Sequence, residues 1–150
     1  MNEAFREFLY RPWTLSERLS TLLENYAVLD SACKSMTANY NKVGGSSGGG
    51  NSCDGPWATT ADLITKIRDH EKRLADAEAQ VDELCKTLPP RGRDVLHYRY
   101  VLRLPWETIR DTMQAKGYRC SALRTLFYWH EEAIKHAEQI WRYQNDFTDE

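Results

Sequence analysis

The sequence predicts an all-α protein in which a long antiparallel helical hairpin, a coiled-coil arm, precedes three shorter helices. Two segments repeat apolar residues in alternating steps of four and three, and a Gly/Ser-rich segment separates them. The remainder shows helical periodicity and no strand alternation. We therefore expect the arm over residues 1–88 and a three-helix domain over 89–150.

Each heptad seam covers 26 residues, which corresponds to about 39 Å of helix. A period of 3.5 sustained over nearly four heptads favours coiled-coil packing. An intramolecular hairpin and an intermolecular four-helix bundle would use the same seams, so both arrangements stay open. His70 is expected as a tolerated polar residue of its seam. The seams consist of Leu15, Leu19, Leu22, Tyr26, Leu29, Cys33, Met36 and Tyr40, and of Leu63, Ile67, His70, Leu74, Ala77, Val81, Leu84 and Leu88.

The segment 41–60 contains six of the eight glycines, which is typical of a flexible linker. A linker of that length lets the second helix fold back beside the first, whether it is a natural loop or an engineered fusion linker. Asp62 is expected near the start of the second helix, as an N-cap or first-turn acid.

The first 13 residues are predicted to form a short helix that Pro12 breaks, because proline removes a helical N–H. Thr14 or Ser16 would then cap the long helix. Glu17, three residues after Thr14, would complete a capping box.

A proline pair, Pro89–Pro90, ends the hairpin. Helices are then predicted over 91–104, 106–116 and 121–143. The second of these begins just after Pro105, and Gly117 is expected as the residue that terminates it. Three helices with a short central one have the lengths of a helix-turn-helix domain.

The composition is that of a folded soluble protein, with 41% hydrophobic, 28% charged and 11% aromatic residues. No secretory signal and no apolar span is visible, so a cytoplasmic location is expected. The net charge of −2 is unevenly distributed: residues 1–85 carry nine Lys and Arg against thirteen Asp and Glu, whereas residues 86–144 carry eleven against six. This pattern suggests a polyanion partner for the second part only.

Neither metal binding nor catalysis is expected. The four cysteines and four histidines lack the spacing of ligand sets, so the cysteines are interpreted as free buried thiols. No P-loop, G-x-S-x-G or H-E-x-x-H motif is present. We therefore expect no enzyme activity and no cofactor.

The string Leu88-Pro89-Pro90-Arg91-x-Arg93-Asp94-Val95-Leu96-x-x-Arg99-Tyr100-Val101 resembles the opening of sigma-70 region 4. The string Leu104-Pro105-Trp106-Glu107-Thr108-Ile109 resembles the start of the second helix of that region. In layout, the whole chain is similar to the phage-encoded RinA/ArpU-like transcription regulators, in which a helical hairpin precedes a sigma-like helix-turn-helix. The resemblance implies a DNA-binding regulator of phage or prophage genes.

The chain departs from the sigma-like pattern at two residues and in the length of one segment. Pro105 stands where a Ser or Thr cap is usual, and Arg110 where a small residue is usual. The segment between Ile109 and the recognition helix is also longer than in the family, and two alignments fit. One places Leu123 and Leu126 on the buried face; the other aligns Leu126, Trp129, His130, Ala133 and Ile134 with a family-like V-x-x-L/W-H-x-x-A-L motif.

By this resemblance, the helix that begins near Ser121 would read the major groove with its first turns. Ser121, Arg124, Thr125 and Tyr128 would face the bases, with Ser121 also a candidate N-cap and Arg124 suited to guanine. Phosphate contacts are expected from cations elsewhere in the domain. Those cations are Arg91, Arg93, Arg99, Arg110, Lys116 and Arg119. Trp106, Trp129 and Trp141 are interpreted as core or interface residues, and His130 as a core residue.

The first functional hypothesis is a transcription regulator with double-stranded DNA as its partner and the hairpin as a homodimerisation arm. RNA polymerase is a further candidate partner, and no membrane is expected. Two alternatives are a small-terminase-type DNA-packaging protein and an RNA-polymerase-binding adaptor that does not bind DNA.

Overall fold

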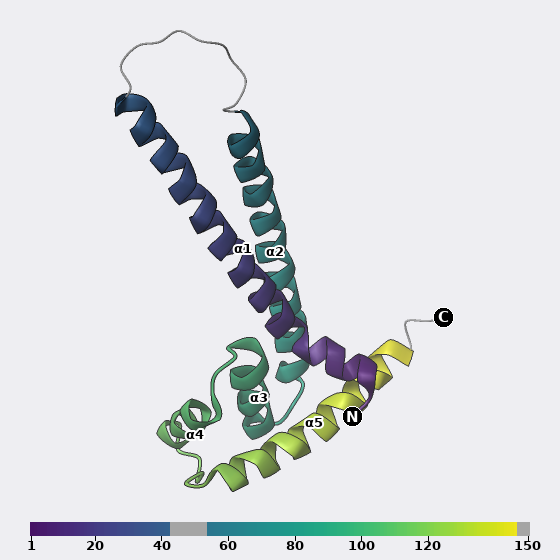
Figure 1. Ribbon diagram of the computed structural model, residues 1–150. Coiled ribbons are helices and arrows are strands. Elements are labelled where there is room, and N and C mark those ends of the chain that lie inside the picture. Colours follow the sequence, from purple (N-terminus) through teal and green to yellow (C-terminus); the bar gives the residue numbers. More distant parts are fainter. Residues whose placement is uncertain (43–53, 147–150) are drawn as a thin grey trace. The chain divides into compact units, whose positions relative to one another are not determined.

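The computed structural model describes residues 1–42 and 54–146, and side chains within 1–36 and 59–146. In these residues the protein is all-α, as predicted. Most of the Gly-rich linker, together with Cys53, lies outside the described residues. The elements are α1 (Glu3–Lys42), α2 (Asp54–Lys86), α3 (Pro90–Leu96), a π-helical turn η1 (His97–Val101), α4 (Trp106–Ala115) and α5 (Leu123–Asp146) (Figure 1).

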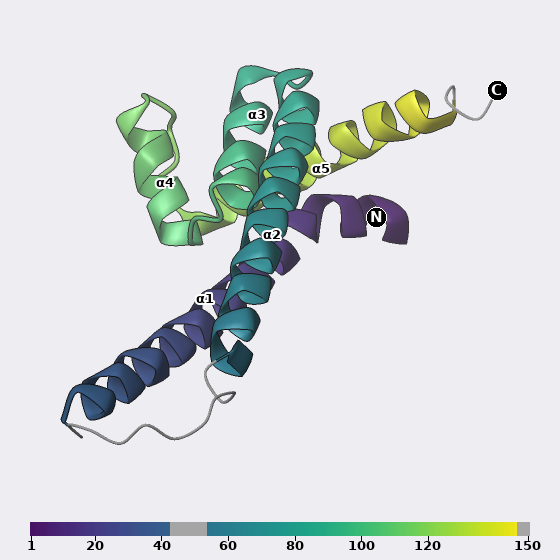
Figure 2. The ribbon, with the colours of Figure 1, turned by 90° about the horizontal axis from the view of Figure 1, so that it is seen from above.

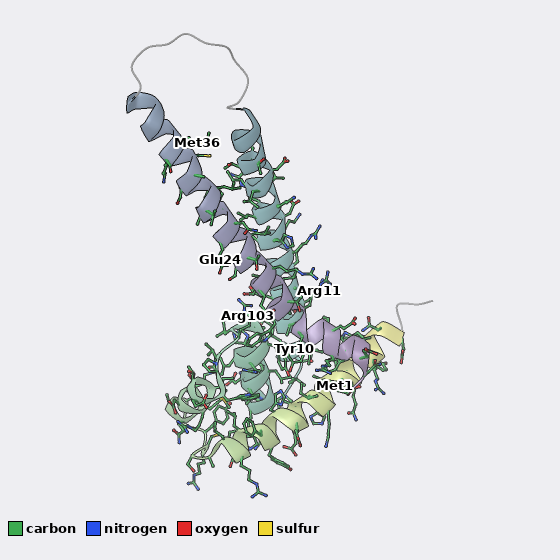
Figure 3. All side chains as sticks on the ribbon, viewed as in Figure 1. Met1, Tyr10, Arg11, Glu24, Met36 and Arg103 are labelled. Atoms are coloured by element: carbon green, nitrogen blue, oxygen red, sulfur yellow. The ribbon has the colours of Figure 1, made fainter. Side chains whose placement is uncertain are left out.

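The two long helices α1 and α2 pack together as an antiparallel hairpin, which confirms that prediction. The seam of α2 is the better buried: Leu63, Ile67, Ala77, Val81, Leu84 and Leu88 are all 9% exposed or less. On α1, Leu15 and Cys33 are buried and the residues between them are half-buried or exposed. Met36, labelled in Figure 3, is 51% exposed, so the predicted seam is not covered at that position.

The prediction that Pro12 breaks the first helix is wrong. Helix α1 continues through Pro12, whose ring is fully buried together with Phe5 and Leu9. Burial of these side chains offsets the single hydrogen bond that proline removes. Thr14 is consequently not an N-cap: its hydroxyl donates to the carbonyl of Tyr10, one turn earlier in the same helix.

The start of the second helix also differs from the prediction. Helix α2 begins at Asp54 rather than after Thr60, so Asp62 lies inside the helix and not at its cap. Helix α1 likewise continues to Lys42, inside the predicted linker. Helical structure therefore extends into the Gly-rich segment from both sides.

The described chain forms two compact units. One unit is residues 15–73, the outer part of the hairpin. The other combines residues 1–14 with 74–150. Within this second unit the first turns of α1 lie beside the second half of α5, as Figures 1 and 2 both show. Phe5 and Phe8 contact Trp141 there, and the backbone N–H of Asn2 donates to Glu138 at 2.7 Å.

The second unit contains two hydrophobic clusters. The first joins the start of α1, the end of α2, α3, η1 and the middle of α5. Its buried members are Phe5, Leu9, Val81, Leu84, Cys85, Leu88, Leu96, Tyr100, Ala133 and Ala137. The second joins α3, α4 and the start of α5, with Val95, Ile109, Met113, Cys120 and Leu126 buried.

The predicted helix 91–104 ends earlier and less regularly than expected. After α3 the chain widens into η1, where the N–H of Leu102 donates to the carbonyl of His97, five residues earlier, at 3.0 Å. Arg103 (Figure 3) then adopts a φ of 56°, the left-handed region that favours glycine. Its guanidinium donates to Glu78 at 2.6 Å and to the carbonyl of Val101 at 3.0 Å. These contacts hold the residue in that conformation.

Helix α4 begins and ends as the sequence predicts. Pro105 occupies its cap position with extended backbone, and its carbonyl accepts the N–H of Ile109. At the other end Gly117 has a φ of 96°, and its N–H donates to the carbonyl of Gln114. The N–H of Tyr118 donates to the carbonyl of Met113, which completes a Schellman motif.

Helix α5 begins at Leu123, two residues after the predicted position. The carbonyl of Ala122 accepts the first helical N–H groups, from Thr125 and Leu126. Ala122 and not Ser121 is therefore the N-cap residue, and the expectation for Ser121 is wrong on this point. The segment 116–122, called the turn below, joins α4 to α5.

None of the described helices has an apolar stretch that is long enough to cross a bilayer. Cys33, Cys85 and Cys120 are buried, and burial raises the pKa of the Cys85 thiol to about 12.

Candidate nucleic-acid interface

The start of α5 presents a polar, exposed face. Ser121 and Arg124 are exposed, Thr125 is half-buried, and Tyr128 is 58% exposed. Arg124, Thr125 and Tyr128 follow spacings of three and four residues and lie on one side of α5, and Ser121 lies in the turn just before this helix. The four residues predicted to face DNA bases are thus brought together.

The opposite face of α5 is the packed one. Leu126 is fully buried, Ala133 is 4% exposed, and Leu123 and Trp129 are partly buried against the second cluster. His130 and Ile134 lie on the same core side. The residues of both alignments to the sigma-like pattern therefore point toward the core, and the exposed face is the same in each.

The electrostatic character of this end of α5 is positive. Its first turn contains no acidic residue, and the unpaired N–H groups of a helix N-terminus attract anions. Arg124 and, in the turn, Arg119 are exposed. Within the described part of the chain, neither guanidinium forms a hydrogen bond or an ion pair. Both remain available to a ligand.

Two other predicted phosphate contacts instead hold a buried acid. Asp94, 7% exposed, accepts hydrogen bonds from Arg93 at 3.3 Å, from Lys116 at 2.9 Å and from the hydroxyl of Tyr118 at 3.3 Å. Burial by itself would raise the pKa of Asp94, but the hydrogen bonds and charges of Lys116 and Arg93 outweigh it and hold that pKa below its ordinary value. The network ties α3 to the turn that leads into α5.

Arg99 and Arg110 also have partners within the protein, Arg99 between two aromatic rings and Arg110 at the surface. The guanidinium of Arg99 lies 5.0 Å from the ring of Trp13 and 4.6 Å from the ring of Trp106, and it donates to the carbonyl of Leu104. Arg110 donates twice to the neighbouring Asp111, at 2.8 and 2.9 Å. The sequence predicts a phosphate contact for Arg99; in the structure its guanidinium lies between two indoles.

Arg91 sits at the edge of a groove between α3 and α5, which we call the α3–α5 groove. Its guanidinium lies 4.9 Å from the ring of Trp129 and donates to Glu132 at 3.3 Å. The second oxygen of Glu132 accepts from the hydroxyl of Tyr128 at 2.8 Å. The groove has a volume of about 1020 Å³ and is lined by residues 88–92, by Gly117, Tyr118 and Arg119 of the turn, and by Tyr128, Trp129, Glu132, Ala133, Lys135, His136 and Gln139 of α5.

His130 is a core residue, as expected. Its Nε2 shares a hydrogen bond of 2.9 Å with the hydroxyl of Tyr100, and its ring packs against Trp106. Burial, helped by the nearby charge of Arg99, lowers the pKa of His130 to about 4. A neutral imidazole in this position serves packing.

Sequence reasoning missed three residues of this region: Asp94, Lys135 and His136. Asp94 is the one acid in 91–101 and directly precedes Val95 and Leu96, a position that could have marked it as buried. Lys135 stands seven residues after Tyr128, so the helical period places both on one face.

No protein-family model, curated protein or solved structure matches this chain. In the part of the chain that the structure describes, no group of three or more His, Cys, Asp or Glu residues is arranged to hold a metal ion.

Proposed function

We propose that this chain is a DNA-binding transcription regulator whose sigma-like helix-turn-helix comprises α4, the turn and α5. In this proposal the first turns of α5 enter the major groove of double-stranded DNA. The hairpin serves as a homodimerisation arm, and the regulated genes are those of a phage or prophage, as the resemblance of the sequence implies.

One observation carries the proposal: Arg119 and Arg124 are exposed and unpaired within the described structure, next to Ser121 and Tyr128, at the one end of α5 that lacks acids. Most other cations of this basic segment are engaged by carboxylates or aromatic rings. An arginine held free at the start of an exposed helix is suited to a bidentate contact with guanine. A surface that served solubility alone would not require these two arginines to stay unpaired while most neighbouring cations are paired.

The proposal assigns different roles to the predicted residues. Arg124 is assigned to a base, Arg119 and the chain entering α5 to phosphates, and Tyr128 to the rim of the interface. Arg93, Arg99 and Lys116 are assigned to holding the domain together, since the contacts that they form are internal, whereas Arg110 pairs at the surface with the neighbouring Asp111.

The test is fluorescence anisotropy of the full chain on double-stranded fragments from its own locus, with an unrelated fragment as reference. We expect saturable binding to one fragment. Arg124→Ala should remove about 1–3 kcal/mol of the preference for that fragment over the unrelated one. Arg68→Ala, which removes an exposed arginine of the hairpin, is the matched control and should behave as wild type.

Absence of binding to any fragment at micromolar protein and low salt would overturn the proposal. RNA polymerase would then become the partner to examine, as for an adaptor that does not bind DNA. Ring-shaped oligomers in solution would instead favour the packaging alternative.

A further inference from the structure

The α3–α5 groove continues the exposed face of α5 beyond its first turns. Tyr128, Glu132, Lys135, His136 and Gln139 all line it. Their spacings of three, four and seven residues place them in one row along the helix. This row starts at Tyr128, the residue that also ends the predicted base-reading face.

The row is long enough for an extended ligand. From Tyr128 to Gln139 the helix rises about 16 Å, at about 1.5 Å per residue. A single DNA strand advances about 3.4 Å per nucleotide, so this length matches several successive phosphates.

The charges lining the groove favour an anion. Lys135 and Arg119 are exposed, and neither forms an ion pair within the described residues. Glu132 is the only acid among the described lining residues, and Arg91 neutralises it. The remaining formal charge is positive, with the hydroxyl of Tyr128 and the amide of Gln139 as neutral partners.

Glu132 also organises the rim of the groove. One of its oxygens accepts from Arg91 and the other from Tyr128, so that a residue of α3 and a residue of the reading face are held to the same carboxylate. The stacking of Arg91 over Trp129 fixes the same guanidinium from a second direction. The wall of the groove is therefore preformed.

We infer that the α3–α5 groove binds the phosphate backbone of the same DNA whose bases the start of α5 reads, with Arg119 and Lys135 as its phosphate-binding residues. This inference rests on the proposed function. It extends the contact about two helical turns past Tyr128, on the side of α5 that carries Lys135 and His136, and assigns this stretch to affinity and not to sequence preference.

The experiment measures the dependence of the DNA dissociation constant on salt, by anisotropy, on specific and unrelated fragments. Lys135→Ala and Arg119→Ala should each weaken binding severalfold on both fragments and reduce the log–log salt slope by about 0.9. Lys72→Ala, which removes an exposed lysine of the hairpin, is the matched control and should leave the slope unchanged.

A variant that is expected to tighten DNA binding distinguishes an electrostatic effect from damage to the fold. Glu132→Gln keeps an acceptor for Tyr128 and removes the one acid of the groove, so it should tighten binding to both fragments. Damage to the fold would instead weaken binding in all of these variants. Weakened binding by Glu132→Gln, in a variant that unfolds at the same urea concentration as wild type, would overturn the inference.

The failures of the two proposals are distinguishable. If Arg124→Ala loses sequence preference while Lys135→Ala and Arg119→Ala keep the wild-type slope, the groove inference is wrong and the proposed function stands. If wild type binds no DNA, both are wrong. If poly-L-glutamate binds wild type but not Lys135→Ala, and the DNA slope is unaffected, the groove is a site for an acidic protein and the inference is overturned.

Discussion

Asp94 is the residue on which the geometry of the basic segment depends. Its carboxylate accepts hydrogen bonds from Arg93 of α3 and from Lys116 and Tyr118 of the turn. A buried carboxylate is tolerated only with such partners, and it therefore holds these cations in fixed positions. The same constraint keeps Lys116 beside Tyr98, whose ring lies 5.4 Å from its ammonium nitrogen. Two cations that a count of charges would assign to DNA are consequently part of the scaffold.

His130 makes stability depend on pH in a defined direction. Its folded-state pKa of about 4 lies below the ordinary value of 6.5, so protons bind the unfolded chain more readily between these two values. Stability should therefore fall as the pH decreases from about 7 toward 4, by an amount on the order of 1–2 kcal/mol at pH 5.

Urea unfolding at pH 7 and pH 5 measures this effect. His130→Gln, which retains a polar partner for Tyr100, should be less stable than wild type at pH 7 but should lose less stability between the two pH values. An equal loss in both proteins would show that His130 is not the group responsible.

Among the elements, two glycines of the described residues disfavour substitution for different reasons. Gly117 has a φ of 96° and open space around the position of a Cβ. Gly92, at the start of α3, has no such φ, but a Cβ there would lie 3.2 Å from the Cβ of Ala133 in α5. Backbone conformation selects the first glycine and helix–helix proximity the second.

The destabilisation caused by Ala and by Asn should therefore rank in opposite order at the two positions. At Gly117, Ala should cost about 1–2 kcal/mol of unfolding free energy and Asn less, because Asn tolerates positive φ. At Gly92, Asn should cost about 1–3 kcal/mol and more than Ala, because the larger side chain crowds Ala133. Chemical denaturation of the four variants measures these differences. The same ranking at both positions would contradict the two explanations.

The first turns of α1 are held to the shorter helices by a specific aromatic arrangement. Arg99 of η1 lies between Trp13 and Trp106, and the indole N–H of Trp13 donates to the carbonyl of Arg99 at 3.2 Å. Tyr10 (Figure 3) meets Tyr100 edge to face at 5.4 Å. The beginning of α1 is therefore an integral part of the unit that contains α3, α4 and α5.

At the scale of the whole molecule, the proposed function makes a prediction about DNA. If the hairpin is a dimerisation arm, two copies should present two α5 helices to one site. Footprinting should then show paired half-sites with centres about one helical turn apart, near 34–36 Å.

Sedimentation of the free protein should agree with this stoichiometry by giving the mass of a dimer. A monomer in solution together with a single protected half-site would rule out the dimerisation role. It would leave the assignment of α5 to the major groove unaffected.

Much of the local structure follows from residues that are near one another in the sequence. Heptad periodicity predicted the hairpin, the absence of strand alternation predicted an all-α chain, and Gly117 predicted the end of α4. These features depend on residues close together in the chain, whose preferences act within one or two turns. The exposed residues near the start of α5 were found in the same way, since helical spacing alone places Arg124 and Tyr128 on one face.

Other features depend on contacts between residues that are distant in the sequence, and local patterns do not predict them. Pro12 predicted a break, but burial of Phe5 and Leu9 against residues more than seventy positions away keeps α1 continuous. The same cluster places residues 1–14 and 74–88 with the shorter helices. The roles of Asp94 and Arg99, the π-helical turn and the α3–α5 groove likewise result from contacts between separate helices. Local preferences are weak, so where they conflict with burial of a core, burial determines the structure.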